Sequence, residues 1–386
     1  MKRALLSAAA MLLVAWAAGC DRSDSPAPAT PAEPMAPNWP MFRGSPAFRG
    51  VATGRLPDAL ALRWKFQADD TIKSSPAIQD GRVFVGCDDG RVYAIGLADG
   101  RKVWAYETSD AVEASPLVVD GVVYVGSADG CLYAIDAAAG TLRWKYRTED
   151  RLLGAANWTP SPDGRGKQIL VGGYDTRLHC VDAATGEAAW TLATDNFING
   201  AVAVADGKAV FGSCDARVHV VNLADGTEAA AIDAGAYVAG SPALAGGRAY
   251  VANYEGKLLC IDLAAGKVVW EYGDGESAFY SSPAVGDGVL VIGSRDKRLH
   301  AVDLATGRPR WTFATRGDVD SSPVLCGDKI VVGSQDGRLY LVRLKDGREV
   351  WSYETGQPVT ASPAVAADRV VIADEGGTVY AFGPKP

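Results

Sequence analysis

Histidine, cysteine and acidic side chains are the groups in this 386-residue chain that could carry catalysis or bind a metal. The chain has only three histidines, His179, His219 and His300. Each stands where other copies of a repeated segment carry tyrosine, as at Tyr93 and Tyr133. Side chains that occupy one position in separate repeat units pack locally and do not converge on a metal ion. We therefore predict packing histidines.

The cysteines beyond Cys20 are too scattered for a metal site or for a redox pair. No two are adjacent, and no C-x-x-C spacing occurs among them. We expect small buried thiols, with one bridge between two repeat units as the alternative. These cysteines are Cys87, Cys131, Cys180, Cys214, Cys260 and Cys326.

The acidic residues outnumber the basic ones, 46 to 38, and no long basic run is present, which argues against nucleic acid as a partner. Most of the acids stand at fixed places in glycine-containing turns, such as Asp136 four residues before Gly140. There a carboxylate accepts backbone N–H bonds while the glycine takes a left-handed conformation. We therefore favour turn capping over the alternative, a ring of acids such as Asp89 and Asp129 that binds cations.

These side chains are positioned by a repeat of about 40 residues that tryptophan marks. The intervals between its tryptophans are 40, 40, 46, 80, 41 and 40 residues, and the interval of 80 hides a copy in which Ala230 replaces tryptophan. Eight units then cover residues 60–383. The tryptophans are Trp64, Trp104, Trp144, Trp190, Trp270, Trp311 and Trp351.

Each unit contains four short apolar runs separated by turns, which is typical of a β-propeller blade. We therefore predict an all-β, eight-bladed propeller of four-stranded blades over residues 60–386. The last unit supplies only three strands, and the tryptophan-containing strand 60–66 comes before the first complete unit without three strands of its own. We expect 60–66 to be the outer strand of the eighth blade, so that the two ends of the chain close the ring.

The first 59 residues have a different composition. Residues 1–19 have a basic start and an apolar run of about fifteen residues, shorter than the ~20 of a membrane span, and predict an export signal. Cys20 follows Ala-Ala-Gly and predicts a lipidated cysteine, with ordinary secretion as the alternative. Residues 20–38 are rich in proline and alanine and predict a disordered tether. Residues 39–59 form a lead-in to the propeller.

The run LYAIDAAAGTLRW at 132–144 and the opening WPMFRG at 39–44 resemble the PQQ-binding-like β-propeller family. The family includes quinoprotein dehydrogenases, for which the resemblance implies pyrroloquinoline quinone, calcium and a pair of adjacent cysteines. It also includes non-catalytic lipoproteins of the outer-membrane β-barrel assembly machinery. This chain lacks adjacent cysteines and large insertions, and we therefore expect no cofactor, no metal and no enzyme activity.

Extra apolar side chains on adjacent loops predict a surface that binds a partner, with packing onto the loops themselves as the alternative. The interpretation is a monomeric periplasmic scaffold, lipid-anchored in the bacterial envelope, that binds other envelope proteins and serves outer-membrane protein assembly or envelope maintenance. The alternatives are a quinone-dependent dehydrogenase and a sensor that binds a small molecule. The candidate surface residues are Leu152, Leu153, Phe197, Tyr237 and Tyr280.

Overall fold

The computed structural model describes residues 34–385 of the chain. The predicted signal segment 1–19, Cys20 and the tether up to residue 33 lie outside the described residues. Within residues 34–385, no helix is long and apolar enough to cross a membrane. The one helix among them is a short 3₁₀ turn, η1 (Phe42–Gly44).

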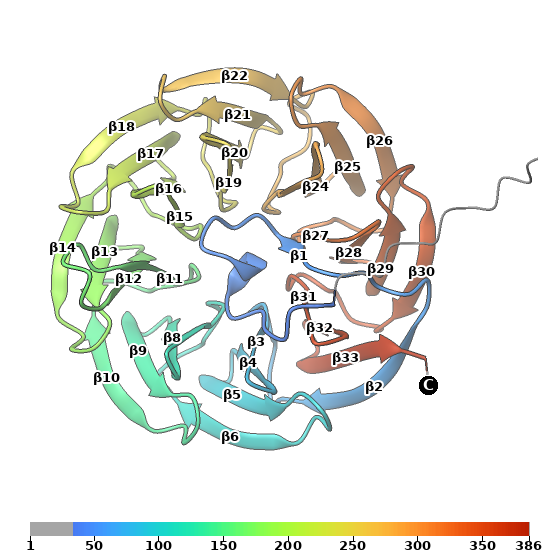
Figure 1. Ribbon diagram of the computed structural model, residues 1–386, viewed down its shortest axis with the longest axis horizontal. Coiled ribbons are helices and arrows are strands. Elements are labelled where there is room, and N and C mark those ends of the chain that lie inside the picture. Colours follow the sequence, from blue (N-terminus) through green and yellow to red (C-terminus); the bar gives the residue numbers. More distant parts are fainter. Residues whose placement is uncertain (1–33, 386) are drawn as a thin grey trace, which may run out of the picture. The chain divides into compact units, whose positions relative to one another are not determined.

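Eight antiparallel sheets of four strands stand around a central channel and form the predicted eight-bladed propeller (Figure 1). From the channel outward, the first four blades contain β3 (Ala77–Gln79), β4 (Arg82–Gly86), β5 (Arg91–Gly96) and β6 (Lys102–Glu107); β7 (Leu117–Val119), β8 (Val122–Gly126), β9 (Cys131–Asp136) and β10 (Leu142–Arg147); β11 (Asn157–Pro160), β12 (Lys167–Gly172), β13 (Arg177–Asp182) and β14 (Ala188–Ala193); and β15 (Ala203–Ala205), β16 (Lys208–Gly212), β17 (Arg217–Asn222) and β18 (Glu228–Asp233).

The remaining blades follow in the same order. They contain β19 (Ala243–Ala245), β20 (Arg248–Ala252), β21 (Leu258–Asp262) and β22 (Lys267–Tyr272); β23 (Ala284–Gly286), β24 (Val289–Ser294), β25 (Arg298–Asp303) and β26 (Pro309–Ala314); β27 (Val324–Cys326), β28 (Lys329–Ser334), β29 (Arg338–Arg343) and β30 (Glu349–Glu354); and β31 (Ala364–Ala366), β32 (Arg369–Ala373), β33 (Thr378–Pro384) and β2 (Leu60–Gln67).

The apolar pattern of the strands follows from their place in the blade. All five residues of β8 are buried, because its sheet is covered on both faces by neighbouring blades. The outer strand β10 instead alternates exposed and half-buried residues. The core therefore lies between blades, in the two middle layers of strands.

The predicted closure of the ring is confirmed. Strand β2 pairs antiparallel with β33, with Leu60 opposite Pro384 and Gln67 opposite Thr378. The eighth blade therefore joins the beginning and the end of the propeller, so that no blade is left with an unpaired outer position.

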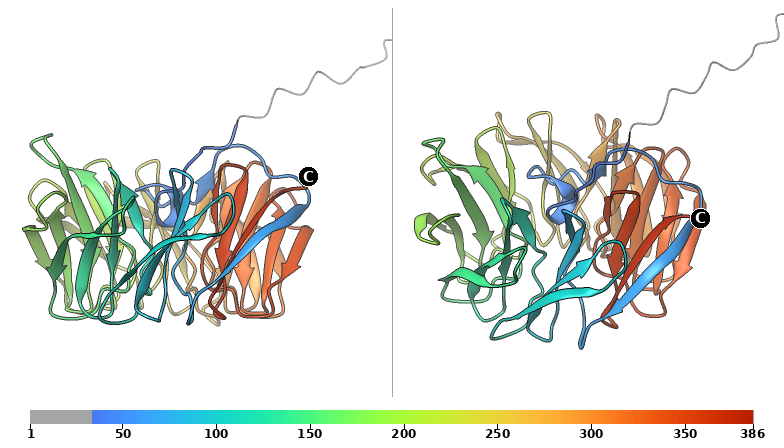
Figure 2. Two further views of the ribbon diagram at one scale, coloured as in Figure 1. Left: turned by 90° about the horizontal axis from the view of Figure 1, so that it is seen from below. Right: turned by 60° about the horizontal axis from the view of Figure 1, so that its bottom comes forward.

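The lead-in lies inside the channel, which the sequence did not predict. Its short strand β1 (Val51–Ala52) pairs parallel with β27, and the lead-in runs across the upper side of the disc in Figure 2. Main-chain carbonyls of the lead-in, together with that of Ala36 from the predicted tether, accept N–H bonds of 2.7–2.9 Å from seven blades, and the Asn157 side chain adds blade three. The acceptors are Ala36, Trp39, Pro40, Pro46, Ala47, Arg49 and Gly50, and the donors are Ala367, Ile78, Val118, Val204, Leu244, Val285 and Leu325.

Arg43 fixes the lead-in at the centre of the ring. Its guanidinium donates to the carbonyls of Pro323 (2.6 Å) and Pro283 (3.0 Å), in blades seven and six. Burial lowers the pKa of Arg43 to about 9, which leaves the side chain protonated at neutral pH. A buried cation bonded to two different blades ties them through the hub.

Candidate functional site

The repeat tryptophans connect each blade to the next one. Trp104, on the outer strand β6, lies against Gly140 in the turn of blade two, and its Nε1–H donates to the Ala137 carbonyl at 3.1 Å. Gly140 has φ +72°, and a Cβ atom placed there would lie 2.7 Å from the indole. This position therefore requires glycine for two reasons, its left-handed backbone conformation and the close approach of the ring.

Six such slots are filled in the same way, with an indole carbon 2.5–2.8 Å from a Cβ placed on the glycine. In five of them the indole N–H donates to a carbonyl of the next blade at 2.8–3.3 Å. The pairs are Trp64 with Gly100, Trp104 with Gly140, Trp144 with Gly186, Trp190 with Gly226, Trp270 with Gly307 and Trp311 with Gly347.

Two tryptophans differ from this pattern. Among residues 34–385, Trp351 meets no turn glycine, and it packs edge-on against Phe382 at 5.5 Å between ring centroids. Trp190 sits on Gly226, but its buried Nε1–H has no hydrogen-bond partner among the described residues.

Aromatic side chains gather on one face of the disc, where the outer strand of each blade leads to the next blade. Phe197 and Tyr237 are 42% and 54% exposed. Phe197 stacks on Tyr174, with centroids 5.0 Å apart and planes at 19°. Tyr254 contacts both Tyr237 (6.4 Å) and Tyr280 (4.7 Å). We call these five residues the aromatic rim; it extends from blade three to blade six.

Tyr174 and Tyr254 belong to the rim, and sequence reasoning missed them. Both stand in the turn after the second strand of their blades, two residues beyond the strand end, at the position where blade two has Ala128 and blade seven has Gln335. That substitution pattern was the available signal. Burial raises the pKa of both tyrosines, and the Tyr174 hydroxyl donates to the Asn199 side chain at 2.7 Å.

An arginine lies at each end of the rim. The guanidinium carbon of Arg151 is 4.3 Å from the centroid of Tyr174, and that of Arg295 is 3.4 Å from the centroid of Tyr280. Arg295 also binds Asp320 through two bonds of 3.1 and 2.9 Å. Cation–π contacts of this kind fix ring orientation at a surface.

Leu152 and Leu153 have different roles. Leu152 is completely buried, and its Cβ atom would be 2.7 Å from a Cβ placed on Gly126. It occupies the core position that Val112 fills in the preceding blade, where Val112 lies as close to Gly86. Leu152 therefore cannot contribute to an exposed surface, and Leu153, which is half-buried, is the member of the pair near the rim.

The histidines and cysteines lie where the repeat predicts. His179 and His300 each contact the carboxylate four residues earlier and a tyrosine hydroxyl of the preceding outer strand, in two separate blades. His219 contacts Asp215 and Glu228. All six cysteines in the described residues are free thiols, and five are buried.

The channel narrows to a small cavity of about 200 Å³ on the rim side, with Phe42 of the lead-in among its lining residues. Its wall is made by the serines that begin the inner strands. Each of these serines accepts, at its Oγ, a bond of 2.9–3.0 Å from a backbone N–H of the preceding blade. Five of the six donors are themselves serines of this set, and the sixth is Ala201. The serines are Ser75, Ser115, Ser241, Ser282, Ser322 and Ser362.

A family model described as outer membrane protein assembly factor BamB matches residues 61–172, 151–278 and 273–385. These matches cover the whole propeller. The chain belongs to this BamB-type family of PQQ-like propellers. No curated protein matches the sequence.

Solved structures share the fold of this BamB-type propeller at low sequence identity. BamB from Moraxella catarrhalis is 19% identical with a TM-score of 0.70, over 84% of this chain and 100% of that one. The quinohemoprotein alcohol dehydrogenase ADHIIG from Pseudomonas putida HK5 is 15% identical with a TM-score of 0.78, over 90% and 82%. The computationally designed Ika8 protein is 16% identical with a TM-score of 0.73, over 82% and 98%. At such identities the likeness concerns the fold.

The channel of this BamB-type propeller does not fit pyrroloquinoline quinone with calcium. A cavity of about 200 Å³ is smaller than the roughly 300–1,000 Å³ of typical ligand pockets. The charged groups at its mouth already have partners, since Lys73 binds Asp88 and Glu113 at 3.0 Å each. Within residues 34–385, no three His, Cys, Asp or Glu side chains are placed to hold a metal ion. The residues present therefore do not match the group that dehydrogenases of this fold carry.

Proposed function

We propose that this protein is a non-catalytic scaffold of the bacterial envelope that binds another envelope protein through the aromatic rim. The observation that carries the proposal is two aromatic groups on one face, the stacked pair Tyr174–Phe197 and the edge-to-face trio Tyr237, Tyr254 and Tyr280. Phe197 and Tyr237 are exposed, and an arginine lies against Tyr174 and another against Tyr280. Tyrosine, phenylalanine and arginine are the residue types enriched where proteins bind one another. The BamB-type family supports a role in outer-membrane protein assembly.

The position of the lead-in fits a tethered scaffold. Ala36 bonds to Ala367 in the turn between β31 and β32, on the face opposite the rim. A chain that continues from there to a lipidated Cys20 starts on the side away from the rim. The rim then remains accessible to a partner while the protein is anchored.

Site-specific photo-crosslinking in cells tests the rim. A photoreactive phenylalanine analogue at position 197 or 237 should give discrete adducts that contain a component of the β-barrel assembly machinery. Leu142, on the outer strand of blade two, is the matched control because it is 42% exposed, as Phe197 is. Equal adduct yields at position 142, or none at 197 and 237, would contradict the proposal.

A double variant separates binding from packing. Phe197→Ser with Tyr237→Ser should strongly reduce recovery of the crosslinked partner while Tm stays nearly unchanged, because more than 40% of each side chain is exposed. A large drop in Tm would show instead that the two rings hold the loops together.

Cys20→Ser tests the anchor. Without the thiol no lipid can be attached, and the protein should move from the membrane fraction to the soluble periplasmic fraction. The unchanged protein fractionated in parallel is the control. Persistent membrane association of the variant would refute lipidation.

A further inference from the structure

One of the tryptophan slots is empty. Blade four carries Ala230 in place of the tryptophan, and the turn glycine that should receive the ring, Gly266 of blade five, is kept with φ +62°. A Cβ placed on Gly266 would meet no atom within 4 Å, whereas the six sister glycines each meet an indole at 2.5–2.8 Å. The receiving half of the slot is therefore present without its ring.

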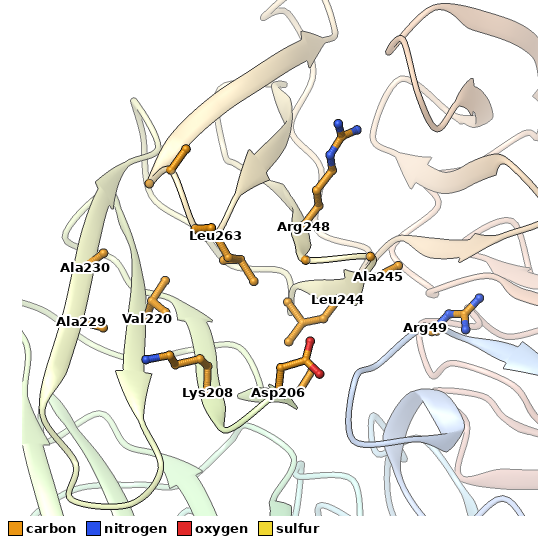
Figure 3. A pocket seen from close by; sticks show the side chains of 16 residues that line it. Arg49, Asp206, Lys208, Val220, Ala229, Ala230, Leu244, Ala245, Arg248 and Leu263 are labelled. Atoms are coloured by element: carbon orange, nitrogen blue, oxygen red, sulfur yellow. The ribbon is translucent and has the colours of Figure 1, made fainter.

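A cavity of about 910 Å³ occupies this place between blades four and five (Figure 3). Val220 and Leu244, almost completely buried in the structure, line it together with Leu263. The Leu263 carbonyl stands three residues before Gly266, as Ala137, the acceptor for the Trp104 indole, stands before Gly140. The cavity therefore offers the apolar walls, the glycine platform and the carbonyl that hold indole elsewhere in the ring.

On the blade-four side, the outer strand β18 contributes only small side chains to the cavity wall. Ala229 and Ala230 are both lining residues, and β18 has alanine at three successive positions, 229 to 231. Opposite Ala230 in the ladder stands Val220, where the sister pairs have Ala94 opposite Trp104 and Ala134 opposite Trp144. One extra branched side chain fills only part of the volume that an indole would take.

The edge of the cavity carries polar groups of both kinds. Lys208 donates to the Asn222 side chain, and Asp206 lies beside Leu244 (Figure 3). The turn Gly246-Gly247 of blade five also lines the cavity and adds no side chain there. Arg49 and Arg248 also line the cavity, which therefore has three basic side chains and one acidic one. These groups match the carbonyl and N–H groups of a peptide main chain, and an isolated indole would use none of the four charges.

We propose that the slot between blades four and five binds a tryptophan side chain of another polypeptide, presented on an extended segment. The ring would lie on Gly266 with its N–H directed to the Leu263 carbonyl, as in the filled slots. Lys208 and Asp206 would meet the main chain next to it. This site is separate from the aromatic rim, which lies on the opposite face.

Binding of short peptides to the full chain tests the proposal. The probes are acetyl-Gly-Trp-Gly-amide, acetyl-Gly-Leu-Gly-amide and free indole, titrated while the backbone amide signals are followed by NMR. We expect the tryptophan peptide to bind about tenfold or more tighter than the leucine peptide and to shift the Gly266 amide by its ring current. Equal binding of the two peptides would overturn the proposal, and free indole that binds as tightly as the tryptophan peptide would overturn a polypeptide occupant.

A variant whose own tryptophan fills the slot between blades four and five tests where the peptide binds. Ala230→Trp should abolish binding of the tryptophan peptide while Tm rises or stays the same. Ala193→Trp adds an indole at an exposed position of β14 and should leave binding unchanged. If Ala230→Trp fails to fold, the pair Val220→Ala with Ala230→Trp restores the small residue found opposite tryptophan in blades one and two.

Two results separate this site from the rim. The variant Phe197→Ser with Tyr237→Ser should keep full affinity for the tryptophan peptide, whatever it does to the envelope partner. Persistent binding in folded Ala230→Trp would place the peptide elsewhere and overturn the proposal.

Discussion

The junction between blades one and two and the junction between blades four and five have the same backbone and different contents. In the first, Trp104 fills the space over Gly140 and donates to Ala137. In the second, Ala230 leaves Gly266 uncovered beside a cavity of about 910 Å³. The ring tolerates one such gap because each junction also contains buried strand contacts. The tryptophan therefore adds stability to a junction without being required for its geometry.

The largest effect should come from emptying the filled slot. Trp104→Ala removes a half-buried indole and its hydrogen bond, and should cost about 3 kcal/mol, at the lower end for a large aromatic. Denaturant unfolding measures the loss. A cost below about 1 kcal/mol would show that indole docking contributes little at any junction.

The two turn glycines should respond differently to alanine. Gly140→Ala and Gly266→Ala share the strain of a left-handed residue, since φ is +72° and +62°. Only the first also brings a Cβ within 2.7 Å of an indole. We therefore expect Gly140→Ala to cost about 1–3 kcal/mol more than Gly266→Ala in parallel unfolding curves. Equal costs would mean that something else covers Gly266 in solution.

Filling the gap should make the two junctions alike. Ala230→Trp places an indole over Gly266 and should raise the free energy of unfolding by about 1 kcal/mol, the usual gain from filling a cavity. Calorimetry would register it as a higher Tm. A lower Tm that Val220→Ala does not correct would show that the slot has lost its shape.

The smallest difference concerns the indole N–H. Trp104 donates to a carbonyl, whereas the buried Nε1–H of Trp190 has no partner among the described residues. Replacing each tryptophan by phenylalanine removes that N–H. Trp104→Phe should therefore cost about 1 kcal/mol more than Trp190→Phe, which removes an unsatisfied donor. The reverse order would contradict the bonding described for these two slots.

The fold could be predicted because the repeat is recognisable from the types and spacing of its side chains. Tryptophan spacing located every blade, including the copy with Ala230, and the missing fourth strand of the last unit predicted that β2 would complete it. The place of the lead-in could not be predicted in this way. Its contacts to seven blades use main-chain carbonyls, which any residue supplies, and the sequence therefore carries no mark of them.

The candidate surface was predicted in part. Phe197, Tyr237 and Tyr280 stood out because they interrupt polar loops. Their aromatic partners Tyr174 and Tyr254 are in different turns and meet them only in three dimensions. The empty slot was visible as Ala230. The cavity could not be predicted, because a missing tryptophan leaves a cavity only if the backbone around Gly266 stays in place.

The pairing of β2 with β33 sets a condition on when this protein can finish folding. Gln67 and Thr378, which meet at the end of that pairing, are 311 residues apart in the chain. A chain synthesised from its N-terminus has β2 available long before β33, and such distant pairing is slow. Loss of the last strand would leave two edges open to pairing with other chains. The eighth blade can therefore close only after β33 has been synthesised.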